Sequence, residues 1–535
     1  MPDYAENPIL PGFHPDPSIC RVGDEYYLAT STFEWYPGVR IFHSTDLASW
    51  RLVARPLNRA ALLDMRGVPD SCGVWAPCLS YADGRFWLLY TVTRRFDGNF
   101  KDTPNFLTSC ETIDGAWADP VYLNASGFDP SLFHDDDGRK YYLNMVWDHR
   151  ENDSFFRGIV MQEYDTSRQT LLGERQLIFD GSPLDYTEGP HIHRIGDYYY
   201  LVTAEGGTGY GHAVTIARSK VVHGPYEVDP EGAVITASHD PRWPLQRAGH
   251  GDLVVTPGGE IYCVHLCSRM LGGERISPLG RESAIQKLTI SDDGWIRMPG
   301  GDKRPRLRTP IPKAASTAAT VDSQRDDFDS PDLAADFQWL RTPEPDAWMS
   351  LTDHPGMLRL YGQESPGSLF TQALVARRQQ HHHFEAETEV TFEPNNFQQL
   401  AGLTCYYNAS KFHYLYISSD RTRGKQLSIM SCLGATSLEL DFPLATEAIL
   451  LQPGRPVRLR VRVSGMRLQF EWAYPGEAWQ TAGPELDARI LSDEAGKGEG
   501  AQFTGSFVGM TCNDMTGMRL HADFDYFAYR GLIGD

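Results

Sequence analysis

Residues 23–30 read Gly-Asp-Glu-Tyr-Tyr-Leu-Ala-Thr, a turn followed by an aromatic strand, and this pattern returns four more times before residue 300. The further copies begin Gly-Arg-Phe-Trp at Gly84, Gly-Arg-Lys-Tyr at Gly138, Gly-Asp-Tyr-Tyr at Gly196 and Gly-Glu-Ile-Tyr at Gly259. One short strand-like run precedes each copy and two follow it, so every unit of about 60 residues predicts four strands. Five such units in succession are typical of a five-bladed β-propeller.

The repeat ends near residue 308, and the composition of the chain changes there. Residues 309–326 are rich in Pro, Ala, Ser and Thr and are predicted to be a linker. Beyond it, alternating runs such as HFEAETEVTFE (383–393) and VRLRVRVSG (457–465) indicate half-buried strands. The sequence therefore predicts an all-β protein, with a propeller over residues 1–308 and a jelly-roll-like β-sandwich over residues 327–535.

Charge and composition exclude several classes of partner. The 535 residues hold 70 acids against 49 bases, a formal net charge of −21, which disfavours binding to nucleic acids and to anionic lipids. No apolar run approaches the ~20 residues of a membrane-spanning helix, and the N-terminal residues show no secretory pattern. The nine cysteines are scattered and are expected to be reduced thiols. We therefore expect a cytoplasmic protein without a nucleic-acid or membrane partner.

The chemistry is expected where the first strands of the five blades begin, because these strands line the channel and start at the same end. The residues directly before them are Asp16, Ala76, Asp129, Gly189 and Gly251. Trp75, Glu188 and His250 are immediate neighbours of these positions, so three carboxylates and a histidine are predicted around one mouth. Strand initiation explains the prolines that follow, but it does not explain the acids, since clustered like charges are costly.

Three converging carboxylates are compatible with two kinds of chemistry. They can bind a divalent cation, which prefers oxygen ligands, or supply the acid and the base of glycoside hydrolysis. Aromatic residues at or just beyond strand ends favour a sugar: Phe33, Trp75, Phe128 and Trp147. A propeller that binds sugars without cleaving them is the alternative from another functional class.

Seven motifs make the chain similar to glycoside hydrolase family 43, and most similar to the two-domain β-xylosidases of that family. They are NPILPGFHPDPS (7–18), WAP (75–77), FDPS (128–131), TEGPH (187–191), GHGD (249–252), GRES (280–283) and GSFVGM (505–510). The resemblance implies an exo-acting, inverting enzyme that releases D-xylose from the non-reducing ends of xylobiose and xylo-oligosaccharides. α-L-Arabinofuranosidase or a bifunctional enzyme is the alternative. The resemblance also implies a homo-oligomer, either a dimer or a tetramer.

The resemblance assigns roles to individual residues. Asp16 corresponds to the general base, Glu188 to the general acid, and Asp129 to a third acid that orients Glu188 and raises its pKa. Inversion requires room for a water molecule, so the Asp16 and Glu188 carboxyls are expected ~6.5–9.5 Å apart. Arg281 is expected to reach the substrate and Asp16, with a surface ion pair as its alternative role. His250 is expected to support the pocket floor, or else to be a satisfied core histidine.

Further expectations concern the second domain and metals. Phe507 is expected to close the pocket from the sandwich domain, with a place in the sandwich core as its alternative, and Thr208 to border the substrate. The chemistry requires no cofactor. A structural calcium ion is one further expectation, at Asp327, Asp329, Asp523 and Asp525. The Asp135–Gly138 segment is interpreted as a strand turn, and metal binding by His381–His383 is disfavoured because neighbouring strand residues point to opposite faces.

Overall fold

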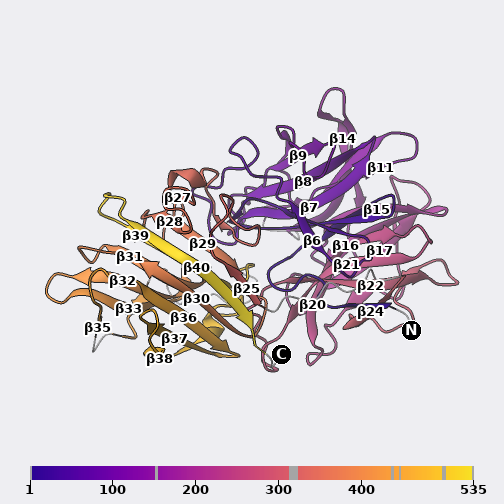
Figure 1. Ribbon diagram of the computed structural model, residues 1–535. Helices are drawn as coiled ribbons and strands as arrows, with labels where there is room; N and C mark the ends of the chain where they lie inside the picture. Colours follow the sequence, from indigo (N-terminus) through magenta and orange to yellow (C-terminus); the bar gives the residue numbers. More distant parts are fainter. Residues whose placement is uncertain are drawn as a thin grey trace. The chain divides into compact units, whose positions relative to one another are not determined.

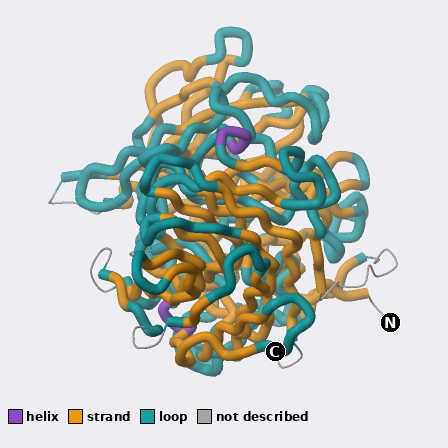
Figure 2. The backbone as a smooth tube through the Cα atoms, turned by 60° about the vertical axis from the view of Figure 1, so that its left-hand side comes forward, coloured by secondary structure: helices purple, strands orange, loops and turns teal. Residues whose placement is uncertain are grey.

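The computed structural model describes residues 3–150, 155–312, 323–434, 439–444, 448–496 and 502–532. This part of the chain is almost entirely strand and loop (Figures 1 and 2), and its only helices are the one-turn 3-10 helices η1 (Pro345–Ala347) and η2 (Ala488–Ile490). Contacts divide the chain into two compact units. The first comprises Met1–Leu63, Cys72–Arg269 and Arg281–Ala318, and the second comprises Asp64–Ser71, Met270–Gly280 and Ala319–Asp535.

The first unit is the predicted five-bladed propeller, built from five antiparallel sheets. The innermost strands are β2 (Ser18–Val22), β7 (Gly73–Ala82), β11 (Ser131–His134), β15 (Glu188–Ile195) and β20 (Leu245–Val255). The second strands are β3 (Glu25–Thr30), β8 (Arg85–Thr93), β12 (Lys140–Trp147), β16 (Tyr198–Glu205) and β21 (Ile261–Arg269). The third strands are β5 (Arg40–Ser44), β9 (Asn105–Cys110), β13 (Phe156–Asp165), β17 (Ala213–Ser219) and β22 (Glu282–Ile290). The outer strands are β6 (Arg51–Ala54), β10 (Val121–Asn124), β14 (Thr170–Phe179), β18 (Glu227–Val228) with β19 (Ile235–Thr236), and β23 (Ile296–Arg297). The short strand β4 (Trp35–Tyr36) stands outside the blades.

The blades close into a ring. Innermost strand β2 contacts β7 and β20, β11 contacts β7 and β15, and β15 contacts β20. The two ends of the unit meet as well, because β1 (Asp3–Glu6) pairs antiparallel with β24 (Arg308–Ile311). The side chain of Asn7 strengthens this closure by donating to the carbonyls of Ile285 and Arg306, 2.9 and 2.8 Å away.

The repeated glycine and the aromatic residues after it have separate roles in each blade. Gly23, Gly84, Gly138, Gly196 and Gly259 all have positive φ between the first and second strands, a conformation that favours glycine. The aromatic residues that follow pack between blades: Trp87 and Tyr142 share one buried cluster, and Tyr200 and Tyr262 lie in two others. Most of the aromatic content of the first unit is therefore blade packing.

A buried carboxylate joins three blades beneath the mouth of the channel. Asp252 on β20 accepts hydrogen bonds from the hydroxyl and backbone of β2, at Ser18 Oγ and Ile19 N, both 2.9 Å away. His193 Nε2 on β15 lies 2.8 Å from the other oxygen of Asp252. Burial alone would raise the pKa of Asp252, but His191, His193 and the amide of Ile19 lower it to about 2. Asp252 is therefore an anion that ties blades one, four and five together.

The second unit is a sandwich of two antiparallel sheets. One sheet is ordered β27 (Met349–Ser350), β28 (Leu358–Tyr361), β40 (His521–Gly531), β30 (His383–Thr391), β36 (Val457–Ser464), β37 (Arg467–Ala473) and β38 (Gln480–Asp487), with β25 (Ser323–Asp326) also on β40. The other is ordered β29 (Ala373–Arg378), β39 (Phe507–Asp514), β31 (Gln399–Asn408), β32 (Lys411–Asp420), β33 (Gly424–Leu433) and β34 (Leu440–Asp441), with β35 (Ile449–Leu450) also on β33. β26 (Trp339–Leu340) stands outside both sheets. Buried and partly exposed residues alternate along β30 and β36, as predicted.

Two loops from the propeller part of the sequence fold with the sandwich. Arg341, only 1% exposed, donates to Asp70 Oδ1 and to the Val68 carbonyl, each at 2.6 Å. Glu494 accepts hydrogen bonds from Ser277 at its amide and its hydroxyl, at 3.0 and 2.9 Å. Residues 64–71 and 270–280 therefore belong to the second unit, although the sequence places both within the propeller repeat.

The predicted linker, 309–326, is shorter in the structure. Its first residues are part of β24 in the first unit, and its last residues are part of β25 in the second unit. Residues 313–322 lie outside the described residues. The ends form strands because their backbone groups complete antiparallel ladders with β1 and β40, which the polar composition did not reveal.

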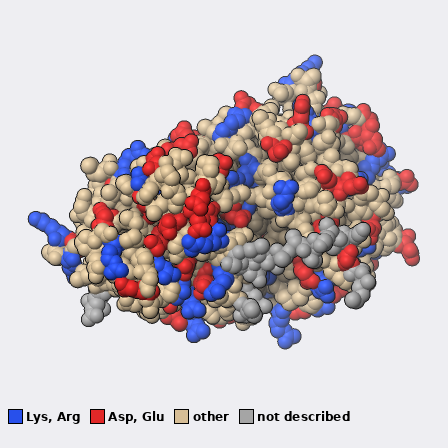
Figure 3. Space-filling model, viewed as in Figure 1, with Lys and Arg blue, Asp and Glu red and all other residues tan. Residues whose placement is uncertain are grey.

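Three observations concern the cysteines, membrane spans and surface charge. None of the nine cysteines forms a disulfide bond. In the described residues no helix is long and apolar enough to cross a membrane. Acidic and basic side chains are interspersed over the face shown in Figure 3.

Candidate active site

The channel mouth of the propeller is built from strained backbone at one position in every blade. Five residues that precede or begin the inner ladders have positive φ: Asp16 (53°), Ala76 (28°), Asp129 (55°), Gly189 (59°) and His250 (45°). Four of them are not glycine, and such conformations cluster where a backbone must aim side chains at a functional site. In the fifth blade this residue is His250 and not Gly251, which corrects the repeat alignment by one residue.

β-Bulges in three of the inner strands also change the direction of side chains at the mouth. The strands β7, β15 and β20 begin earlier than predicted and already contain Trp75, Glu188 and His250. The pairing register shifts at each place, as between Glu188 and His191 on β15. A bulge turns a side chain away from its regular direction, so the three residues are presented by irregular backbone.

Asp16 is held as a carboxylate. Ser31 Oγ donates to Asp16 Oδ2 at 2.6 Å, and Arg281 Nη1 donates to Asp16 Oδ1 at 3.1 Å. Burial alone would raise the Asp16 pKa, but the Arg281 charge and the Ser31 hydroxyl hold it below its ordinary value. Arg281 is itself buried and is therefore not a surface ion pair. The arrangement suits a group that accepts a proton.

Glu188 and Asp129 form a coupled pair of acids. One ligating atom from each, together with one nitrogen of His250, lie within 4.8 Å of one another. Burial raises the pKa of Glu188, and the charge of Asp16 raises it further, although Arg281 and Lys101 act against the rise. Burial and the charges of Glu188 and Asp16 likewise raise the pKa of Asp129. Two carboxyls so close retain one proton between them near neutral pH.

The hydrogen bonds favour Glu188 as the residue that keeps this proton. The amide of Gly189 donates to Asp129 Oδ2 at 3.0 Å, which stabilises the ionised form of Asp129. Among the residues that the structure describes, none donates a hydrogen bond to the Glu188 carboxyl. The site thus contains one carboxylate that is kept ionised, Asp16, and one carboxyl that is kept protonated, Glu188.

His250 lies between the acids. Its Nδ1 is 4.0 Å from Asp16 Oδ1 and 4.0 Å from Asp129 Oδ2. Burial lowers the pKa of His250 to about 4 despite the nearby charge of Asp16, so the ring is neutral at neutral pH. A neutral imidazole therefore occupies the space between Asp16 and Asp129 and does not neutralise the charge of either carboxylate.

Three further residues at the site were not identified from the sequence. Ser31 follows the repeated motif, Lys101 lies in a connection between strands, and His212 ends the glycine-rich segment before β17. His212 is buried, its Nδ1 bonds the Gly207 carbonyl, and burial lowers its pKa to about 3. A Cβ on Gly249 would lie 1.6 Å from His212 Cδ2, so Gly249 and His212 are a matched pair. The glycines close to His212 and His250 were the sequence feature that could have indicated these buried histidines, because Gly249 and Gly189 leave the space that the two rings occupy.

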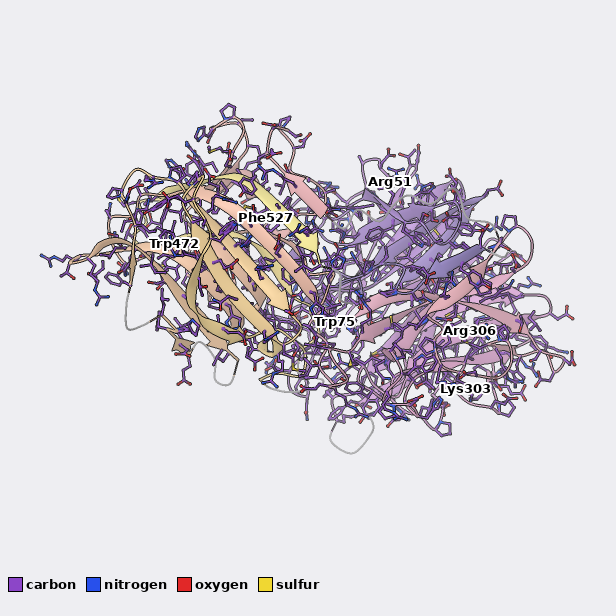
Figure 4. All side chains as sticks on the ribbon, turned by 60° about the horizontal axis from the view of Figure 1, so that its bottom comes forward. Arg51, Trp75, Lys303, Arg306, Trp472 and Phe527 are labelled. Carbon is purple, nitrogen blue, oxygen red and sulfur yellow. The ribbon has the colours of Figure 1, made fainter. Side chains whose placement is uncertain are left out.

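The four predicted aromatic residues form one continuous chain of rings on the propeller. Phe33 and Trp75 have centroids 5.9 Å apart, Trp75 and Phe128 5.5 Å, and Phe128 and Trp147 6.4 Å. Trp75 is labelled on the propeller in Figure 4. Arg281 lies 5.3 Å from the centroid of Phe33, which connects the chain to the carboxylate of Asp16. Such rings suit the apolar faces of a sugar.

Two predicted residues are not joined to this group by any described contact. Thr208 lies on the loop after β16 and makes no hydrogen bond to the acids. Phe507 begins β39 in the second unit, where it is buried and Arg378 lies 5.1 Å from its ring centroid. The contact of Phe507 with the substrate therefore stays a prediction.

The described residues contain one group with three metal-ligating side chains, namely Asp129, Glu188 and His250. It coincides with the acid pair, where a neutral histidine and a shared proton suit acid chemistry better than metal binding. At the predicted calcium position, Arg359 donates to both oxygens of Asp523, at 2.7 and 2.8 Å, and His354 is 3.0 Å away. These contacts give no support to calcium there. His381 and His383 bond Tyr529 and Ser464.

Comparison with known proteins follows the two units. The sequence model of glycosyl hydrolases family 43 matches residues 5–296, and that of the "Beta xylosidase C-terminal Concanavalin A-like domain" matches residues 325–530. The chain is 52% identical to a xylosidase/arabinosidase 43B of Humicola insolens, over 98% of this chain and 97% of that one. It is 48% identical to a β-xylosidase of Bacillus subtilis, over 98% of this chain and 99% of that one.

A solved structure agrees with the sequence matches. The crystal structure of a xylan β-1,4-xylosidase from Bacillus halodurans superposes with a TM-score of 0.95 at 47% identity, over 98% of this chain and 100% of that one. Both units, and the acids at the blade starts, lie within the matched residues. The chain therefore belongs to family 43 of the glycoside hydrolases.

Proposed function

We propose that the protein is an exo-acting, inverting β-1,4-xylosidase that releases D-xylose from the non-reducing ends of xylobiose and xylo-oligosaccharides. The observation that carries the proposal is the opposite displacement of two pKa values, that of Asp16 downward and that of Glu188 upward. Hydrolysis with inversion needs an ionised base and a protonated acid at the same time. The names of the relatives and of the solved neighbour support the choice of xylose.

The proposed reaction uses each group once. Glu188 donates its proton to the glycosidic oxygen as the bond from that oxygen to the anomeric carbon breaks. Asp16 takes a proton from a water molecule, whose oxygen attacks the anomeric carbon from the opposite face. Arg281 keeps Asp16 ionised until this step. After product release, Glu188 is an anion and Asp16 is neutral, and exchange with solvent restores both.

The stereochemistry of the first product tests this mechanism. Proton NMR of xylobiose hydrolysis, followed before mutarotation, should show α-xylose released from the non-reducing end. Release of β-xylose first would contradict Asp16 as the base, since retention requires a nucleophile in its place.

An α-L-arabinofuranosidase is the second candidate, because one relative is named a xylosidase/arabinosidase. The ratio of kcat/KM on 4-nitrophenyl β-D-xylopyranoside to that on the α-L-arabinofuranoside decides between the two. We expect the xyloside to be the better substrate, and the reverse order would make the arabinofuranosidase reading correct.

We also propose that the protein acts in the cytoplasm as a homo-oligomer. The lack of a disulfide bond at any of the nine cysteines supports a reducing compartment. Light scattering coupled to gel filtration measures the oligomeric state, and a mass of 60.1 kDa would correspond to a monomer.

A further inference from the structure

A second cavity opens on the propeller next to the chain of rings. It has a volume of about 330 Å³ and lies among β10, the end of β12 and β14. Its lining includes Phe100, Lys101, Trp147, His149 and Arg175. This volume stands at the lower end of the range for small-ligand sites and suits a single sugar ring.

The cavity on the propeller is called the basic pocket below, defined by Phe100, Lys101, Trp147, His149 and Arg175.

Aromatic rings form one wall of the basic pocket. Phe100 stacks on His149 with centroids 4.5 Å apart and planes 27° apart, and Phe100 is 67% exposed. Trp147 is fixed by a hydrogen bond from its Nε1 to the Asn99 carbonyl at 2.8 Å and by stacking on Phe155 at 5.1 Å. Since His149 covers one face of Phe100, the exposed part of that ring is available to the apolar face of a sugar.

The charge of the basic pocket is opposite to that of the protein. Lys101 Nζ lies 4.1 Å from the centroid of Trp147, and Arg175 is exposed on β14. The described residues that line the pocket include no carboxylate, although the chain carries a net charge of −21. Two cations and an aromatic wall together favour a ligand that joins a sugar ring to an anion.

The basic pocket is connected to the catalytic acid. Trp147 is the last ring of the chain that begins at Phe33, and its centroid lies 6.4 Å from that of Phe128. Lys101 is close enough to Glu188 for the two charges to act on each other's pKa. Glu188 protonates the oxygen of the leaving group in the proposed reaction, so the pocket lies toward the leaving group and not toward the released xylose.

We infer that the basic pocket binds the carboxylate of a uronic acid carried by the leaving-group part of a xylo-oligosaccharide. The inference rests on the proposed function. Arg175 forms the charge-assisted contact with the carboxylate, because a guanidinium matches two carboxylate oxygens, and Phe100 stacks on the sugar ring. The enzyme is then expected to prefer substrates whose leaving group carries a uronic acid.

Two substrates of equal backbone length test the inference: xylotriose, and xylotriose with glucuronic acid on a residue beyond the cleaved bond. We expect wild-type kcat/KM to be about fivefold higher on the acidic substrate at low salt, and the difference to fall as NaCl is added. Arg175→Gln should remove the difference and leave kcat/KM on xylotriose unchanged. Arg168→Gln, a matched loss of an exposed arginine between β13 and β14, should keep the difference.

Each other result has a separate meaning. Equal or lower kcat/KM of the wild type on the acidic substrate, or a preference that survives Arg175→Gln, would overturn the inference while xylotriose is still cleaved. If xylotriose itself is not cleaved, the proposed function fails. In that case NMR titration with D-glucuronate still decides about the pocket: shifts that Arg175→Gln abolishes support it, and their absence in the wild type overturns it.

Discussion

The backbone amide of Gly189 donates a 3.0 Å hydrogen bond to the carboxylate of Asp129. This bond ties β15, the strand that carries Glu188, to Asp129 in the preceding blade, whose innermost strand β11 lies against β15. It also favours the ionised form of Asp129 within the coupled pair, because the amide stabilises the anion of Asp129, and this leaves the shared proton to Glu188.

Gly189→Ala should damage catalysis more than folding. Gly189 has a φ of 59°, and an added Cβ would lie 3.1 Å from His250 Cε1. We expect kcat to fall by about 10²-fold because the acid pair is displaced. Gly196→Ala is the control, since Gly196 has a φ of 60° and open space around it. Equal losses of activity in both variants would show that backbone strain alone is responsible.

The acid and the base should respond differently to the leaving group. Glu188→Gln removes the proton donor, so we expect about a 10³-fold loss of kcat/KM on xylobiose but a much smaller loss on 2,4-dinitrophenyl β-xyloside, which needs no protonation. Asp16→Asn removes the base and should reduce both reactions by similar factors. Initial rates on the two substrates give the comparison. If Glu188→Gln lost both activities equally, Glu188 would not be the acid.

Arg281→Gln should move the pH profile of kcat/KM to higher pH. In the proposed mechanism, activity is lost when Asp16 is protonated at low pH and when Glu188 is deprotonated at high pH. The Arg281 cation lowers the pKa of both carboxyls, so its removal raises both, and each limb shifts upward. Arg281→Lys keeps the charge and should leave the limbs nearly in place. If Arg281→Gln lowered kcat/KM at every pH without moving either limb, Arg281 would act in substrate binding alone.

Asp252→Asn should destabilise the propeller in a pH-dependent way. Folding lowers the pKa of Asp252 from 3.8 to about 2. A lowered pKa contributes stability that is present above pH 4 and lost as the pH falls through about 2, here about 2 kcal/mol. Thermal melts at pH 7 and pH 3 should show a smaller difference at pH 3. Asp24→Asn, on an exposed turn, is the control. An equal change in melting temperature in this variant would show that the buried contacts of Asp252 are not the cause.

Asp70→Asn should destabilise the second unit. Arg341 is buried and donates to Asp70 Oδ1 at 2.6 Å, so Asp70→Asn leaves a buried guanidinium without the opposite charge of this carboxylate, at a cost of about 3 kcal/mol. Asp64 pairs with Arg66 on the same loop, but both are exposed, so Asp64→Asn should change little. Unfolding followed by tryptophan fluorescence measures both variants. Similar small effects would mean that the loop contributes nothing to the unit.

The sequence predicted the repeating parts of this protein well and the irregular parts poorly. The five glycine turns and the residues Asp16, Asp129 and Glu188 were visible because each blade repeats the same local pattern. Ser31, Lys101 and His212 were missed because they lie off the repeat-equivalent position. Ser31 meets Asp16 within the first blade, whereas Lys101 and His212 come near the acids only because the ring of blades closes. The Arg341–Asp70 pair was missed for the same reason, since no local pattern links residues 271 apart.

The two propeller loops that fold with the sandwich also determine the order of events during synthesis. Residues 64–71 leave the ribosome long before Arg341 and Ala409, which hold them in place. At roughly 5–20 residues per second, this wait lasts tens of seconds. The first blades can form in that time. The Asp70 carboxylate on the loop, however, cannot yet accept its hydrogen bonds from Arg341 and Ala409. The second unit can therefore be completed only after both propeller loops have met the C-terminal part of the chain.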